Sequence, residues 1–185
     1  MTTLDSPNTP DAPALPIWNT VLRYGGICAL ALVAYSLISY LMDVDATSIS
    51  AGIINFFVAL GVTVGLAVMA IRHQRTLDGG YMTYGRGLLI GLCAVAIGAF
   101  LANIWNFVLI NFIDPDYVTR LKENFLENWG ESMPPEALEG ALERFDKMGD
   151  IGTNLTAGAG YALFIGLVAG LIAAAFGMKS RPTNL

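Results

Sequence analysis

A chain of 185 residues with a net charge of −5 has the length of one small domain. Hydrophobic residues make up 55% of the chain and charged residues only 14%, against about 25% charged in an average soluble domain. This composition argues against an ordinary soluble domain, and the acidic balance gives no sign of nucleic-acid binding.

The first 20 residues differ from the rest of the chain. They contain four prolines and two aspartates, with no lysine or arginine. A secretory signal needs basic residues, a short apolar run and a small-residue cleavage site, and residues 1–20 have none of these. They carry too little apolar surface to offset chain entropy. We therefore expect a disordered, proline-rich tail on the cytoplasmic side.

Four apolar segments follow, each long enough to cross a bilayer. About 20 helical residues, rising ~1.5 Å each, cross a hydrocarbon core of about 30 Å. Soluble helices of this length normally show a polar face, and these segments do not. The sequence therefore predicts an all-α integral membrane four-helix bundle within residues 21–178. Its spans are expected at residues 21–42, 51–71, 87–113 and 151–178.

The charges around the spans predict the orientation. The connector between the second and third spans carries Arg72, Arg75 and Arg86, whereas residues 43–50 carry two acids and no base. Lysine and arginine near span ends favour the cytoplasmic side, so these arginines are interpreted as topogenic. Contact with anionic headgroups is an alternative role for them. Both termini, including a short tail at residues 179–185, are then cytoplasmic.

Residues 114–150, the acidic segment, contain ten acids and four bases, a net charge of −6. Apolar residues at helical spacing predict two short amphipathic helices here, separated by Pro134 and Pro135. Asp114 is expected to cap the first of them, with Pro115 at the first helical position. We expect this segment on the outer side, lying against the bundle or the membrane surface.

The chain contains few histidines and cysteines, the residue types that often bind metals, exchange electrons or transfer protons. His73 is the only histidine, and Cys28 and Cys93 both fall within predicted spans. This pattern gives no metal-ligand spacing and no redox pair. The spans also lack the interior ionisable groups that proton and ion transporters normally use. We therefore expect no catalytic residues, no metal and no cofactor.

Three asparagines form a possible polar site in the spans: Asn103, Asn106 and Asn154. Asn103 and Asn106 are one helical turn apart in the outer part of the third span. Such amides usually hydrogen-bond across helices, which contributes about 0.6–2 kcal/mol each. We favour this structural role over a path for a transported solute.

Small residues at regular spacing are the strongest signal in the spans. Glycines separated by three residues let helix backbones approach closely, where van der Waals packing stabilises the contact. The candidate helix-packing residues are Gly61 and Gly65, Gly87 and Gly91, Gly98, and Gly166 and Gly170. The spacing leaves open whether they join helices of one chain or of two.

Two motifs resemble a known family. The sequence DGGYMTYGRGLLIGL contains Gly79, Gly80 and Tyr81, and the sequence NFIDPDYV contains Asp114, Pro115 and Asp116. Both are similar to motifs of the bacterial membrane proteins grouped as domain of unknown function 4199. The resemblance implies four spans in a bacterial inner membrane and brings no catalytic residues with it.

Taken together, these patterns favour a non-enzymatic scaffold or accessory subunit that acts through helix packing and its acidic segment. The alternative is a small transporter or channel component that uses Asn103, Asn106 and Asn154. The expected partners are the lipid bilayer and either a second copy of the chain or another membrane protein.

Overall fold

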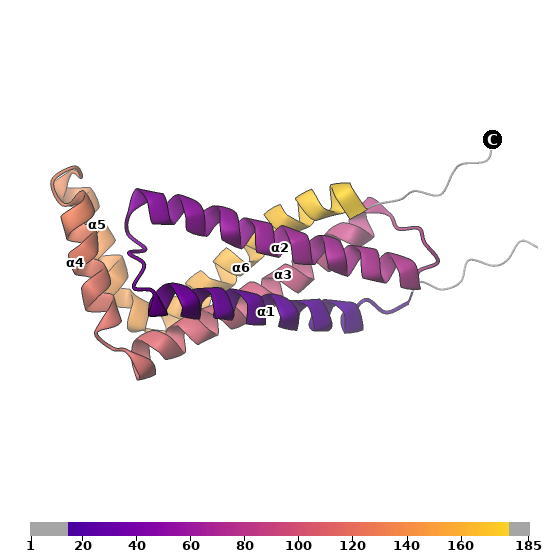
Figure 1. Ribbon diagram of the computed structural model, residues 1–185, viewed down its shortest axis with the longest axis horizontal. Coiled ribbons are helices and arrows are strands. Elements are labelled where there is room, and N and C mark those ends of the chain that lie inside the picture. Colours follow the sequence, from indigo (N-terminus) through magenta and orange to yellow (C-terminus); the bar gives the residue numbers. More distant parts are fainter. Residues whose placement is uncertain (1–14, 178–185) are drawn as a thin grey trace, which may run out of the picture.

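The computed structural model describes residues 15–177, which form four long helices with a helical hairpin at one end (Figure 1). The long helices are α1 (Trp18–Leu41), α2 (Ile49–Leu77), α3 (Tyr84–Val108) and α6 (Ile151–Gly177), and the hairpin consists of α4 (Tyr117–Trp129) and α5 (Pro135–Asp146). All four long helices are long and apolar enough to cross a membrane. The predicted all-α membrane bundle is confirmed. Of the tail predicted at residues 1–20, residues 1–14 lie outside the described residues and residues 18–20 belong to the first turn of α1. The tail predicted at residues 179–185 also lies outside the described residues.

The helix ends differ from the predicted spans. α1 begins at Trp18, three residues before the predicted start. α2 continues to Leu77, so Arg72 and Arg75 lie on the helix and not on the connector. Hydrophobicity alone places a span end at the first charge, but a long arginine side chain can reach the interface while its backbone stays helical. Only residues 78–83 separate α2 from α3.

The turn between α2 and α3 depends on two glycines. Gly79 and Gly80 have φ angles of 78° and 92°. A side chain in this left-handed region costs roughly 1–2 kcal/mol, because the Cβ approaches the following carbonyl oxygen. These glycines let the chain reverse within a few residues and return the buried Met82 to the core.

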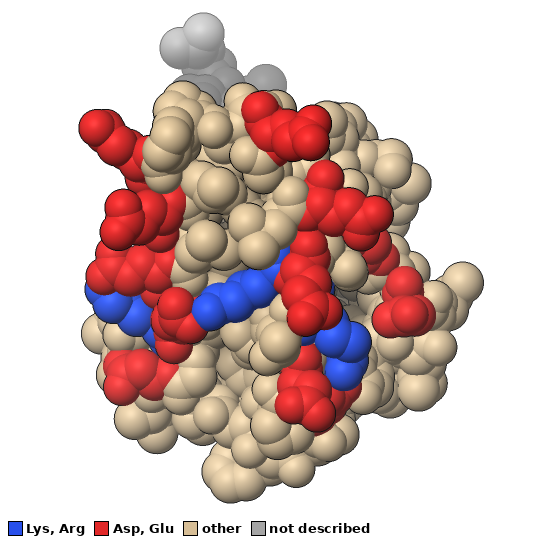
Figure 2. Space-filling model, turned by 90° about the vertical axis from the view of Figure 1, so that its left-hand side faces the viewer, with Lys and Arg blue, Asp and Glu red and all other residues tan. Residues whose placement is uncertain are grey.

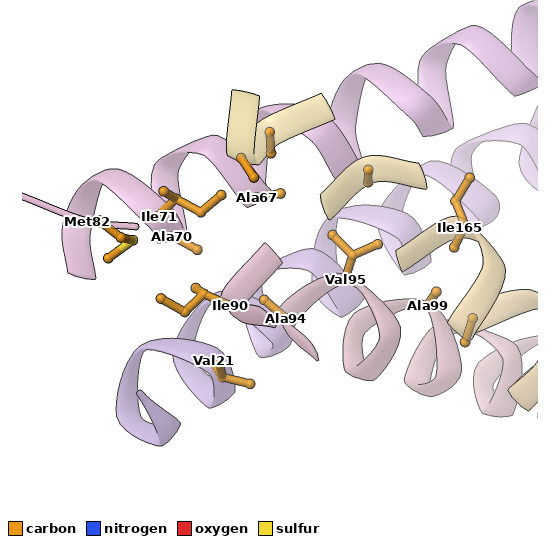
Figure 3. Close-up of a cluster of buried hydrophobic side chains, with 14 residues drawn as sticks. Val21, Ala67, Ala70, Ile71, Met82, Ile90, Ala94, Val95, Ala99 and Ile165 are labelled. Carbon is orange, nitrogen blue, oxygen red and sulfur yellow. The ribbon is translucent and has the colours of Figure 1, made fainter. Parts of the chain in front are cut away.

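α3 is the central helix of the bundle, because it contacts α1, α2 and α6 and forms the two most extensive interfaces, with α6 and with α1. Buried side chains from all four long helices converge around it (Figure 3). They include Val21 of α1, Ile71 of α2, Ile90 and Val95 of α3, and Ile165 of α6. Many of the remaining core residues are alanines, so the helix axes lie close together.

The tightest seam joins α3 to α6. A Cβ atom added to Gly91 would lie 3.1 Å from the Cα of Gly170, and one added to Gly166 would lie 2.8 Å from the Leu92 carbonyl oxygen. Gly98 makes a similar approach on the α1 side, where its Cβ would lie 2.6 Å from the Cβ of Cys28. Larger residues would force these helices apart.

α2 packs against the bundle mainly with its second half. All its buried residues lie between Thr63 and Gln74, and its first half diverges from the other helices toward the hairpin (Figure 1). The Tyr35 hydroxyl donates a hydrogen bond to the Asn55 amide oxygen and so links this half to α1. The first half exposes large apolar side chains: Ile49, Ile53, Ile54, Phe56 and Phe57.

The segment between α3 and α4 differs from the prediction. The helix ends in a wider π-helical turn, Leu109–Ile113, and α4 does not begin until Tyr117. The expectation that Asp114 caps α4, with Pro115 at the first position of α4, is therefore wrong. The Asp114 carboxylate instead accepts hydrogen bonds from the Tyr40 hydroxyl, at 2.8 Å, and from the Arg120 guanidinium. Hydrogen bonds from a charged donor such as this guanidinium are among the strongest that a carboxylate accepts.

The hairpin lies across one end of the bundle, which we name the hairpin end. Phe125 of α4 packs against Phe145 of α5, with ring centroids 5.3 Å apart. The indole N–H of Trp129 donates to the Thr47 carbonyl oxygen at 2.9 Å, so α4 is attached to the turn between α1 and α2. The opposite end, which holds the α2–α3 turn, is named the arginine end.

Candidate functional site

A network of polar side chains joins three helices at the arginine end. The Thr20 hydroxyl donates to Gln74 Oε1 at 2.5 Å, and Gln74 Nε2 donates to Asp78 Oδ1 at 3.2 Å. Arg86 Nε donates to Asp78 Oδ2 at 2.8 Å, and Arg86 Nη2 donates to the Leu15 carbonyl oxygen at 2.5 Å. The network thus ties the start of α1 to the end of α2 and the start of α3.

Every side chain of this network has a hydrogen-bond partner, as buried polar side chains require. Gln74 is fully buried, and the Asp78 side chain is only 6% exposed. The neighbouring Arg75 donates from Nη1 to the Gly177 carbonyl oxygen at 2.9 Å, which satisfies the end of α6. Arg75 and Arg86 therefore hold helix ends together, whereas Arg72 is exposed. Satisfied and paired in this way, the network is suited to a structural role.

The hairpin end contains the asparagines that the sequence singled out. Asn103 Nδ2 donates to Asn154 Oδ1 at 2.8 Å and to the Asn154 carbonyl oxygen at 3.3 Å, across the α3–α6 seam. A Cβ atom on Gly158 would collide with the Asn103 amide, so the pair fits only because this position lacks a side chain. Asn106 is exposed and takes no part in the pair.

A pocket of about 480 Å³ opens beside this pair, between α3, α5 and the first turns of α6. Its polar lining residues are Asn103, Arg144, Lys147, Thr153, Asn154 and Tyr161. A second pocket of about 400 Å³ lies between the first turns of α2 and Trp129, and its lining is mostly apolar. The first pocket is the better candidate for a site, because several polar groups converge on it.

Acidic side chains spread over the hairpin end, with lysines and arginines between them (Figure 2). Ion pairs neutralise part of this charge: Arg120 with Asp114, Lys122 with Asp146, and Lys147 with Glu143. Hydrogen bonding to the Arg120 guanidinium lowers the pKa of Asp114, and bonding to Lys147 lowers the pKa of Glu143. Both carboxylates are therefore held in their charged form at neutral pH.

No group that suggests metal or thiol chemistry appears in the described part of the chain. Within residues 15–177, no three His, Cys, Asp or Glu side chains lie close enough together to hold a metal ion. Cys28 is buried, Cys93 is half-buried, and both are free thiols. The ring of His73 packs against Tyr24, with centroids 5.7 Å apart.

The predicted helix-packing glycines fall into two groups. Gly91, Gly98, Gly166 and Gly170 lie in close seams, and Gly87 makes ordinary contacts with Ile71 and Ala174. Gly61 and Gly65, by contrast, are exposed, with nothing within 4 Å of where a Cβ would lie. These two glycines therefore join no helices within the described part of the chain.

Sequence reasoning found Asn103 and Asn154 but missed the basic lining of their pocket and the arginine-end network. Thr20 and Gln74 are 54 residues apart in the chain, so no local pattern connects them. Arg144 and Lys147 resemble ordinary surface charges until the hairpin places them beside α6.

Comparison with known proteins gives a family and no activity. No curated protein and no solved structure matches this chain. A family profile described as a protein of unknown function, DUF4199, matches residues 23–179. The match begins within α1 and covers the rest of the described chain, including the other three long helices and the hairpin. The predicted resemblance is therefore confirmed, and the chain belongs to the DUF4199 family of proteins of unknown function.

Proposed function

We propose that this protein is a non-enzymatic scaffold or accessory subunit that packs against another protein within the membrane. The observation that carries the proposal is the exposed first half of α2. It diverges from the bundle and presents large apolar side chains, and Gly61 and Gly65 follow in the middle of the helix on an open surface. Glycines at this spacing allow a second helix to approach closely, with packing as the stabilising force.

The charges support an orientation for this subunit. Arg72, Arg75 and Arg86 lie near the arginine end, and the acidic segment lies at the hairpin end. By the rule that basic residues stay on the cytoplasmic side, the arginine end faces the cytoplasm of a bacterial inner membrane. The acidic segment then lies on the opposite side, where it offers a charged surface to a partner.

The alternative, a small transporter or channel component, has less support. Asn103 and Asn154 lie together at a pocket, but Asn106 is exposed and outside it. Toward the arginine end, the backbones of α3 and α6 approach closely at Gly91 and Gly170. A seam this tight counts against a polar path between these two helices. Solute flux into liposomes that is abolished by Asn103→Leu would favour the transporter over the subunit.

The test is the composition of the complex extracted from the native membrane. We expect native mass spectrometry in mild detergent to show the wild-type chain bound to another membrane protein or to a second copy. The double variant Gly61→Leu/Gly65→Leu should be recovered largely as a monomer, because leucine side chains would hold the partner helix away.

Gly160→Leu is the matched control. Gly160 is also an exposed glycine of a spanning helix with nothing within 4 Å of its Cβ position, but it lies on α6. This variant should keep the complex. A wild-type chain that is monomeric throughout, or a complex that survives both α2 substitutions, would contradict the proposal.

A further inference from the structure

The lining of the pocket at the hairpin end is basic, although the segment around it is acidic. The lining includes Arg144 and Lys147 and no aspartate or glutamate. The acidic segment as a whole has ten acids and four bases. Two of its four bases therefore face the one pocket that also holds the Asn103–Asn154 pair.

The arginine in this pocket has free hydrogen-bonding capacity. Within residues 15–177, the Arg144 guanidinium makes no ion pair and no hydrogen bond. A guanidinium presents five N–H donors in a planar fork that fits the oxygens of a phosphate. Lys147 pairs with Glu143 at 2.6 Å, but both side chains are more than half exposed. Exposed pairs of this kind are weak, so the ammonium can turn toward an anion in the pocket.

Uncharged polar groups stand beside the two bases. Asn103 and Asn154 line the pocket, and Thr153 lines it as well. Asn154 Nδ2 also donates to the Met148 carbonyl oxygen at 3.3 Å, which holds its amide in place. Such groups can hydrogen-bond the ester and glycerol oxygens that adjoin a phosphate.

The remaining wall is apolar and continues along a spanning helix. Ala157, Gly158 and Tyr161 of α6 line it, and Tyr161 is 58% exposed. Further along α6, Leu163 and Phe164 are also exposed. A ligand seated here would have its anionic end against α5 and its apolar part along α6. This is the arrangement of a phospholipid at the boundary between headgroups and acyl chains.

We propose that this pocket, between α3, α5 and α6, binds the phosphate-bearing headgroup of an anionic phospholipid from the leaflet at the hairpin end. Arg144 and Lys147 bind the anionic headgroup. Asn103, Thr153 and Asn154 bind the neutral oxygens, and the exposed side of α6 contacts an acyl chain. The site is separate from the α2 surface, so the lipid-binding proposal is tested independently of the proposed subunit role.

The test is lipid titration of the full-length protein in detergent, followed by native mass spectrometry. The added lipids are phosphatidylglycerol and phosphatidylcholine with identical acyl chains. The wild-type protein should bind phosphatidylglycerol about tenfold more tightly, because each base near the surface strengthens the attraction for an anionic lipid. Arg144→Gln/Lys147→Gln should abolish this preference.

The matched control is Arg120→Gln/Lys122→Gln. It removes the same charge from the same segment, but neither residue lines the pocket. This variant should keep the preference for phosphatidylglycerol. Equal loss in both double variants would mean nonspecific attraction, and equal retention in both would mean binding elsewhere. Either result overturns the proposal.

Competition with inorganic phosphate distinguishes a site for a lipid from a site for a free anion. Millimolar inorganic phosphate should leave bound phosphatidylglycerol in place, because free phosphate makes no contact with the apolar wall. Complete displacement by inorganic phosphate would overturn the assignment to a lipid. Thermal unfolding of each variant in the same detergent verifies that the bundle is intact.

Discussion

Single side chains join the membrane part of this protein to its acidic segment. Asp114 is the clearest case, because it follows α3, accepts from Tyr40 at the end of α1, and pairs with Arg120 of α4. At the other end, Asp78 accepts from Gln74 of α2, from Arg86 of α3 and from the backbone N–H of Leu15, which precedes α1. In both places a carboxylate collects donors from neighbouring residues and one donor that is more than 60 residues away in the chain.

The pairing of Asp114 has a consequence for pH. The Arg120 guanidinium, followed by the Tyr40 hydroxyl, lowers the pKa of Asp114 from its usual value of about 3.9. A lowered pKa in the folded state means that the charged form stabilises the fold. This stabilisation is fully present above pH ~4 and is lost as the pH falls through the lowered pKa.

We therefore predict that Asp114→Asn lowers the thermal unfolding midpoint at pH 7. The difference from wild type should shrink below pH ~4, where protonated aspartic acid resembles asparagine. The measurement is a series of unfolding curves in detergent across this pH range. Asp116→Asn is the control, since its carboxylate lies on the exposed side of the same loop. A difference that does not change with pH would exclude the charged pairing.

At the scale of the helices, the contrast between α2 and α6 is the main result. Both carry glycines separated by three residues, but only those of α6 are used within the chain. Gly166 and Gly170 meet the backbone of α3, whereas Gly61 and Gly65 face outward. The same sequence pattern therefore serves an internal seam in one helix and an open surface in another.

We predict that Gly170→Val destabilises the bundle by roughly 1–3 kcal/mol, because its side chain has no room against the α3 backbone. Gly160→Val, on the same helix, should change the stability by no more than about 0.5 kcal/mol, since its Cβ position is open. Unfolding by a denaturing detergent, followed by circular dichroism, measures both. Equal effects of the two substitutions would mean that the α3–α6 seam is looser than described.

For the whole molecule, the question is how firmly the hairpin is attached to the bundle. None of the residues of α4 and α5 is fully buried, and both helices rely on a few polar contacts. Trp129 donates to the Thr47 carbonyl oxygen, and Asn128 Nδ2 donates to Asp45 Oδ2 at 2.7 Å. We infer that the hairpin can open without unfolding of the spans.

We predict that Asn128→Ala/Trp129→Phe speeds amide hydrogen exchange in α4 and α5 by several-fold and leaves the cores of α3 and α6 protected. The reason is that both substitutions remove the bonds to the turn before α2. Glu139→Ala, an exposed position on α5, is the control. Loss of protection throughout the bundle would show instead that the hairpin and spans unfold as one unit.

The features that the sequence alone determined are local ones. The length of each apolar run predicts the four spans, Gly79 and Gly80 predict the sharp turn, and Pro134 and Pro135 predict the break between the two short helices. Each follows from a few neighbouring residues, because spanning length, backbone freedom and proline geometry need no tertiary contact. The same local reasoning singled out Asn103, Asn106 and Asn154, of which only Asn103 and Asn154 line the pocket.

The tertiary structure alone decided which residues meet. In the folded chain Gly170 faces α3, whereas Gly61 faces outward. Asp114 pairs with Arg120 and does not cap a helix, and Arg144 lines the same pocket as Asn103. These outcomes depend on how each helix is rotated about its axis. That rotation is set by packing between segments far apart in the chain, and apolar spans without a polar face carry little periodic signal to predict it.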